Sequence, residues 1–161
     1  MNKKMWQTLN EQVNHELYAA YLYLAMAAYF EDKNFQGFAY WMHKQSKEEI
    51  GHAMKIYNYL YERGSKVELL PIAQPKTVWK SPLDAFKDAL KHEQKVTGLI
   101  NNLVTIAEKE KDRAAFSFLQ WYVDEQVEEE NQVNEIIAKL EMIKDCSGCL
   151  LMLNHELGKR E

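Results

Sequence analysis

The sequence predicts an all-α protein, a bundle of four long helices followed by a short fifth helix. Three observations predict this fold: long stretches without glycine or proline, apolar residues recurring every three or four positions, and short breaks between the stretches. Residues 5–36 and 99–147 contain neither glycine nor proline, and long helices are the common use of such stretches. A chain of 161 residues has the usual size of one domain, so we expect a single domain over residues 1–161.

Start signals and breaks locate the helices. Ser81 and Pro82 begin the third helix, because serine is a preferred N-cap and proline fits the first helical turn. Asn34 and Asp112 are the expected caps of the second and fourth helices, and Gly148 marks the break before the last one. The expected helices cover residues 5–33, 35–63, 82–110, 113–143 and 148–157.

The connections between helices set the expected topology. Tight turns join the first helix to the second and the third to the fourth, so each pair forms an antiparallel hairpin. The segment 64–82 holds three prolines and a glycine, which excludes a continuing helix. It is long enough to run the length of the bundle. We expect an up-up-down-down arrangement with one long crossover, between the second and third helices.

Composition and charge exclude several classes of protein. With 47% hydrophobic and 27% charged residues the chain has an ordinary globular composition, not that of a disordered segment. It carries 20 basic and 24 acidic residues and no basic stripe, which argues against a nucleic-acid partner. We find no signal peptide and no apolar run long enough to span a bilayer, so we expect a cytoplasmic protein without a membrane partner.

The only two cysteines, Cys146 and Cys149, form one C-x-x-C pattern. A structural zinc or rubredoxin-type site needs a second such pair, which the chain lacks. We therefore expect reduced, inert thiols.

The core positions of the four long helices carry the candidate chemistry. Each helix has apolar residues in steps of three and four, interrupted near its middle by a glutamate. These glutamates are Glu16, Glu49, Glu93 and Glu129. Antiparallel packing would bring them to one level, where carboxylates in a dry core repel one another and lose their hydration. No lysine or arginine occupies a core position at that level, so we expect two metal ions to supply the positive charge.

His52 and Tyr23 support the metal interpretation. His52 follows Glu49 by three residues and faces the same side of its helix, and Glu-x-x-His is a known ligand spacing in bundles. Carboxylates with one imidazole suit iron better than structural zinc. Tyr23 lies two turns from Glu16, where its hydroxyl can bond a ligating carboxylate. Alone, each of the two residues would be compatible with ordinary core packing.

An acidic run on the fourth helix indicates a further metal site. Glu125 lies one turn before Glu129, and Glu128 is adjacent to it. Together with Glu48, beside Glu49, these carboxylates are candidates for a site on the inner surface of the bundle. Such a run is also compatible with a solvated helix face, and spacing alone leaves both interpretations open.

These residues together resemble the ferritin family, and most closely its bacterial and archaeal non-haem members. The resemblance covers essentially the whole chain and is strongest at residues 9–18, 48–52, 91–94 and 118–130. It implies a ferritin-like four-helix bundle with a di-iron centre and a third iron site. The implied ligand sets are Glu16, Glu49 and His52 for the first iron, Glu49, Glu93, Gln126 and Glu129 for the second, and Glu48, Glu125, Glu128 and Glu129 for the third. Glu49 would bridge the first two irons.

The resemblance also implies a function, iron storage with ferroxidase activity. Fe(II) would be oxidised to Fe(III) at the di-iron centre by O2 or peroxide and stored as a ferric oxyhydroxide mineral inside a homo-oligomeric, 24-subunit shell. Tyr23 matches the family's tyrosine beside the centre, and the fifth helix resembles the one that lines four-fold channels in the shell.

Departures from related families sharpen this expectation. Bacterioferritins and rubrerythrins carry a second Glu-x-x-His on the fourth helix, and residues 125–129 here contain no histidine. Bacterioferritins place a haem-ligating methionine after the bridging glutamate, where this chain has Ile50, so we expect no haem. Two other functions remain open: a di-iron peroxidase without storage, and a purely structural bundle, which would carry apolar residues in place of the four glutamates.

Overall fold

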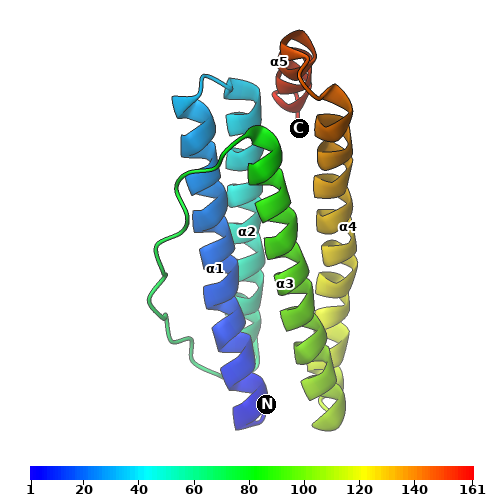
Figure 1. Ribbon diagram of the computed structural model, residues 1–161. Helices are drawn as coiled ribbons and strands as arrows, with labels where there is room; N and C mark the ends of the chain where they lie inside the picture. Colours follow the sequence, from blue (N-terminus) through cyan, green and yellow to red (C-terminus); the bar gives the residue numbers. More distant parts are fainter.

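The computed structural model describes residues 1–161 as five helices without strands. The helices are α1 (Lys3–Asp32), α2 (Gln36–Glu62), α3 (Pro82–Lys109), α4 (Arg113–Ile143) and α5 (Ser147–Leu157). The four long helices lie side by side, and α5 lies at one end of the bundle, against α2 and α4 (Figure 1). All five predicted helices are present, and each observed boundary lies within two residues of the predicted one.

Two of the predicted helix caps are confirmed. The Ser81 hydroxyl accepts a hydrogen bond from the Asp84 backbone N–H at 3.1 Å, with proline in the first turn of α3. The Asp112 carboxylate accepts one from the Ala115 backbone N–H at 3.0 Å. Each side chain satisfies a backbone donor that has no partner within its helix, which determines where α3 and α4 begin.

The predictions for Asn34 and Gly148 are wrong. Asn34 is not a cap but adopts a left-handed conformation with φ of 60°, and α2 begins after Phe35 without a side-chain cap. A tight turn between antiparallel helices requires a left-handed residue, which asparagine tolerates better than most. Gly148 lies inside α5, because the chain turns earlier, at Lys144 with φ of 50°.

The order of helix directions also differs from the predicted one. In Figure 1, α1 and α4 run in one direction and α2 and α3 in the other, so the order is up-down-down-up rather than up-up-down-down. Each tight turn reverses the chain within a hairpin. The crossover returns along the whole bundle, so that α3 starts at the end where α2 started and the two run parallel.

The crossover is fixed against α1. Asn10 exchanges two hydrogen bonds with the backbone of Glu68: its amide nitrogen donates to the carbonyl and its amide oxygen accepts from the N–H, each at 2.8 Å. Near the other end of α1, the rings of Trp79 and Tyr29 meet edge to face at 5.4 Å. These contacts attach the crossover to α1 near both ends of that helix, and at Glu68 they satisfy both backbone polar groups.

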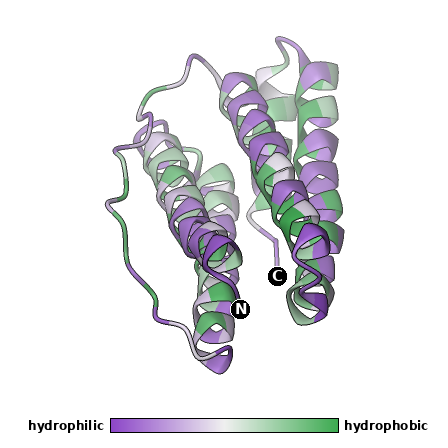
Figure 2. Cartoon of the chain, turned by 90° about the horizontal axis from the view of Figure 1, so that it is seen from below, coloured by the Kyte–Doolittle hydropathy of each residue, from purple (hydrophilic) through white to green (hydrophobic).

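A polar layer divides the buried core into two apolar clusters. One cluster, beside α5, includes Phe30, Phe38 and Phe86, and the other, towards the opposite end, includes Leu9 and Ile100. Hydrophobic and hydrophilic residues alternate along each long helix, as expected when one face is buried (Figure 2). Most of the buried polar residues belong to the candidate site described below: Gln12, Glu16, Gln45, Glu49, His52, Glu93, Gln126 and Glu129.

The thiol prediction is wrong. Cys146 and Cys149 are joined in a disulfide, with their Cα atoms 5.2 Å apart. Cys146 precedes the first residue of α5 and Cys149 lies in its first turn, so the helical bend brings the two side chains within bonding reach. None of the five helices is long and apolar enough to cross a membrane.

Candidate metal centre

The four core glutamates converge in the polar layer, one from each long helix. Their side chains are almost fully buried, with exposed fractions of 1% for Glu16, 3% for Glu49, 1% for Glu93 and 2% for Glu129. Glu49 belongs to two groups of metal-type ligands. Glu16, Glu49 and His52 form one, Glu49, Glu93 and Glu129 the other, and the ligand atoms within each group lie within 4.8 Å of one another. This arrangement can hold two neighbouring metal ions with Glu49 between them.

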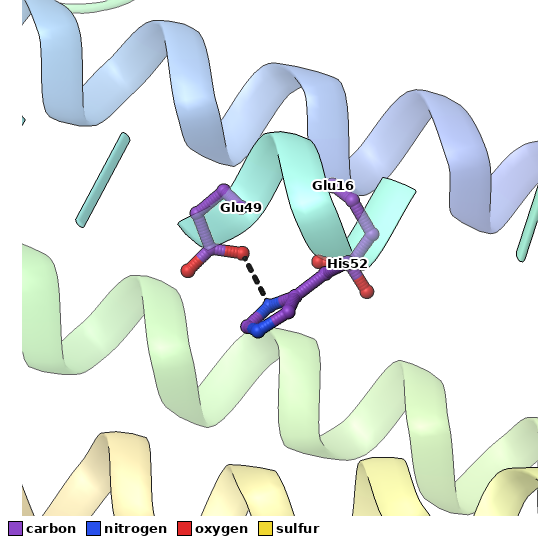
Figure 3. Close-up of side chains that lie close together, drawn as sticks. All are labelled: Glu16, Glu49 and His52. Carbon is purple, nitrogen blue, oxygen red and sulfur yellow. Dashed lines mark hydrogen bonds and ion pairs between the residues drawn. The ribbon is translucent and has the colours of Figure 1, made fainter. Parts of the chain in front are cut away.

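Glu49 and His52 come from one face of α2, and Glu16 approaches them from α1 (Figure 3). The His52 Nδ1 atom lies 3.1 Å from a Glu49 oxygen, and its Nε2 atom lies 3.5 Å from a Glu125 oxygen. The Tyr122 hydroxyl donates to the backbone carbonyl of His52 at 2.7 Å. Because Glu49 and His52 are one helical turn apart, the carboxylate and the imidazole project from the same face of α2 and can bind the same metal ion.

Two glutamines donate hydrogen bonds to the core glutamates, each to the glutamate one turn further along its own helix. Gln12 donates its side-chain N–H to Glu16 at 2.9 Å. Gln45 donates to Glu49 at 3.2 Å and to Glu129 at 2.6 Å. Sequence reasoning missed both roles, although each glutamine lies four residues before its glutamate, a spacing that places side chains together on a helix.

Glu93 receives its donors from two other helices. The Tyr23 hydroxyl donates to one of its carboxylate oxygens, so the tyrosine bonds the carboxylate on α3 rather than Glu16 on its own helix. The Gln126 side chain donates to the other oxygen at 3.2 Å and also to the Glu93 backbone carbonyl at 3.2 Å. Each of the four core glutamates thus accepts at least one side-chain hydrogen bond without any lysine or arginine, which limits the cost of burial.

Burial and mutual repulsion make these carboxyls weak acids. Burial, and then the charge of Glu49, raises the pKa of Glu16 from 4.5 to about 8. Burial, and then the charges of Glu49 and Glu93, raises the pKa of Glu129 to about 9. The pKa values of Glu49 and Glu93 are raised for the same main reason. Protons therefore neutralise part of this layer at neutral pH, and a metal ion that binds here displaces them.

The residues predicted for the third iron are only partly brought together. Glu125 and Glu129 form a ligand group with His52, with atoms within 4.8 Å. Glu48 instead pairs with Arg160 at 2.6 Å, and Glu128 accepts a hydrogen bond from Gln132 at 3.2 Å. Of the four carboxylates expected around the third iron, Glu125 and Glu129 therefore lie with His52, whereas Glu48 and Glu128 have other partners.

The fold and the site together define a class of protein: four-helix bundles in which each long helix contributes a carboxylate to one buried cluster of potential metal ligands. A family model described as a ferritin-like domain matches residues 7–143. The chain belongs to the ferritin family.

Individual relatives agree over the full length. A bacterial non-heme ferritin of Staphylococcus aureus (strain USA300) is 44% identical over 160 residues, which cover 99% of this chain and 96% of the relative. The bacterial non-heme ferritin of Staphylococcus haemolyticus is 46% identical over 160 residues, again covering 99% of this chain and 96% of the relative. The crystal structure of an open pore ferritin from the hyperthermophilic archaeon Archaeoglobus fulgidus has a TM-score of 0.99 at 46% identity, covering 100% of this chain and 99% of the other.

Proposed function

We propose that this chain is an iron-storage protein with ferroxidase activity. It takes up Fe(II), oxidises it to Fe(III) at the paired site with O2 or peroxide, and stores the product as a ferric oxyhydroxide mineral inside a shell of identical subunits. The observation that carries this proposal is the position of Glu49 in both buried ligand groups, because a shared carboxylate holds two irons close enough to act together.

The two iron positions draw on the residues singled out in the sequence. Glu16, Glu49 and His52 bind the first Fe(II), and Glu49, Glu93, Gln126 and Glu129 bind the second. Oxygen-rich ligands accept both Fe(II) and Fe(III), which an oxidation cycle requires.

The reaction balances across the two irons. Each Fe(II) gives up one electron, and O2 takes both electrons and two protons and leaves as hydrogen peroxide. Peroxide as the oxidant takes two electrons and two protons and leaves as two waters. The carboxyls of Glu16 and Glu129 release protons inside the site when metal binds, because their pKa values lie above neutrality. Tyr23 and Gln126 hold Glu93 in place from two directions.

Exposed apolar residues near α5 support assembly into a shell. Met142 is 79% exposed, Met152 75% and Leu151 60%. Large apolar side chains gathered on one part of a surface are typical of protein–protein contacts. We propose that other copies of this chain cover them in a homo-oligomer, with 24 subunits as the expected number.

Oxidation kinetics test the site. Glu49→Ala removes the shared carboxylate, so we expect the rapid oxidation of Fe(II) in air, followed by the absorbance of Fe(III), to slow by at least about 100-fold. Glu141→Ala, an exposed glutamate on α4, is the control and should oxidise iron at the normal rate. Unchanged kinetics in Glu49→Ala would refute the site assignment.

Storage is tested separately from oxidation. Light scattering measures the mass of the assembly, and electron microscopy after iron loading detects a mineral core. A di-iron peroxidase without storage would form a small oligomer and leave no core. A large shell that holds iron mineral is expected here.

A further inference from the structure

Arg160 follows α5 and inserts its side chain between α2 and α4. Its guanidinium is mostly buried, with 15% of the side chain exposed. One terminal nitrogen donates to Gln45 Oε1 at 2.9 Å and to the Trp41 carbonyl at 3.3 Å. The other donates to Glu48 Oε2 at 2.6 Å and to Gln132 Oε1 at 3.3 Å. The group also lies over the Trp41 ring, 4.5 Å from its centre, so contacts on several sides fix its position.

This arginine reaches two of the four carboxylates proposed for the third iron. It binds Glu48 directly. It reaches Glu128 through Gln132, whose amide oxygen accepts from Arg160 while its amide nitrogen donates to Glu128 at 3.2 Å. The guanidinium therefore supplies positive charge and hydrogen bonds at the place where a metal ion would otherwise supply charge.

The other two carboxylates face the opposite way. Glu125 and Glu129 lie with His52, on the side of the paired site. Gln45 lies between the two halves: its oxygen accepts from Arg160, and its nitrogen donates to Glu129 and Glu49. The Gln45 amide has an oxygen that only accepts hydrogen bonds and a nitrogen that only donates them. By occupying the oxygen, Arg160 directs the nitrogen towards the two glutamates.

We propose that Arg160 is a resident cation that competes with iron for the third site. The inference rests on the proposed function, since it concerns the step after iron leaves the paired centre. While the guanidinium holds Glu48, the four carboxylates cannot gather around one metal ion. An arriving ion must displace Arg160, so the third site binds weakly and iron passes on to the mineral.

The charge of the arginine itself does not change with pH in the physiological range. A guanidinium stays protonated in proteins, so only a stronger attraction for the carboxylates can displace it. Fe(III) attracts carboxylates more strongly than Fe(II) does because of its higher charge. Displacing Arg160 costs free energy whichever ion arrives. Fe(III) therefore occupies the third site more readily than Fe(II).

Metal binding to the assembled protein tests the proposal, with Zn²⁺ as a probe that does not change oxidation state. Arg160→Gln removes the charge, and Lys159→Gln removes the same charge from the exposed neighbouring residue. In calorimetric titrations we expect Arg160→Gln to tighten the weakest class of sites by at least about tenfold, because a charge-assisted hydrogen bond no longer opposes the metal. Lys159→Gln should leave that affinity unchanged.

Crystals of both variants and of the unaltered protein, soaked in Zn²⁺ and measured at the zinc edge, locate the ions. We expect the paired positions to be filled in all three, and the position between Glu48 and Glu129 to gain occupancy only in Arg160→Gln. Adding Glu48→Gln to Arg160→Gln should abolish that gain. Arg160→Lys keeps the charge but loses the planar guanidinium, so it should give a smaller gain in zinc occupancy at the third site. This variant replaces Arg160→Gln in the test if Arg160→Gln does not assemble.

The possible failures are distinguishable. Empty paired positions in every crystal would overturn the proposed function itself. Filled paired positions with equal third-site occupancy in Arg160→Gln and the unaltered protein would overturn the role of Arg160 alone. An equal gain in Lys159→Gln would also overturn it, because the effect would then be one of net charge rather than of this contact.

Discussion

At the scale of single residues, protons and amide groups stabilise the buried carboxyls of the site. Acidic residues from four helices can share a dry layer because their carboxyls hold protons and accept hydrogen bonds from Gln12, Gln45, Gln126 and Tyr23. From the sequence we expected metal ions alone to neutralise these carboxylates. Burial raises the pKa of Glu16 to about 8 and that of Glu129 to about 9, so protons are a second source of neutralisation near neutral pH.

These raised pKa values predict how the metal-free protein responds to pH. Folding raises the pKa of Glu16 from 4.5 to about 8, so the folded state holds its proton more tightly than the unfolded state. The free energy of unfolding should therefore fall as pH rises from about 4.5 to about 8, by at most about 1.4 kcal/mol per pH unit for this carboxyl. Thermal unfolding of metal-free protein across this range measures the slope. Glu16→Gln cannot ionise and should make the slope less steep, while Glu129 still contributes to it; an unchanged slope would contradict the prediction.

Tyr23 supports a second prediction at this scale. Tyr23→Phe removes the hydroxyl that donates to Glu93 and keeps the buried ring. We expect a loss of about 10-fold to 100-fold in Fe(II) affinity or oxidation rate, since partners that orient a ligating carboxylate have effects of this size. Tyr21→Phe, at an exposed tyrosine on the same helix, is the control. If both variants behaved like the unaltered protein, Tyr23 would be a packing residue only.

At the scale of helices, close backbone contacts position α5 on α2. A Cβ atom added at Gly37 would lie 1.6 Å from the carbonyl oxygen of Asn154 in α5, so only glycine fits there. The Asn154 side chain also accepts from the Phe38 backbone N–H at 3.0 Å. These contacts hold the end of the chain where Arg160 can reach between α2 and α4.

Substitution at this contact tests how α5 is held. Gly37→Ala should push α5 away from α2 and reduce the fraction of fully assembled protein, as measured by light scattering. Gly51→Ala, where the added methyl group meets nothing within 4 Å, is the matched control on the same helix. It should assemble normally and gain up to about 1 kcal/mol in stability, because alanine favours a helix interior over glycine. Equal assembly of the two variants would exclude a role for the Gly37 contact.

At the scale of the whole molecule, the polar layer separates two apolar clusters that together form the core. Ions that bind in this layer link all four long helices, since each helix contributes a ligand. Metal binding should therefore stabilise the entire bundle rather than one part of it. Saturating Zn²⁺ at about 100 times its dissociation constant should add about 2.7 kcal/mol per site to the free energy of unfolding. The same addition should have a much smaller effect on Glu49→Ala; equal stabilisation would indicate that the ions bind elsewhere.

The sequence by itself determined the helices and the glutamates of the site. Where a helix begins and ends depends on local backbone geometry, which the order of residues sets. The signals used here were the glycine and proline positions, the caps Ser81 and Asp112, and the apolar repeat of three and four residues. Because helix phase follows from residue number, Glu49 and His52 could be placed on one face and the four glutamates at one level before any contact was known.

Only the tertiary structure decided which partners these side chains have. The path of the crossover set the order of helix directions, and the turn at Lys144 brought the end of the chain back to α2, so that Arg160 meets Glu48 more than a hundred residues earlier in the sequence. The tertiary structure also brought the hydroxyl of Tyr23 to Glu93, a residue on a different helix. Local rules do not reach such contacts, because they depend on where distant segments meet once the core has closed.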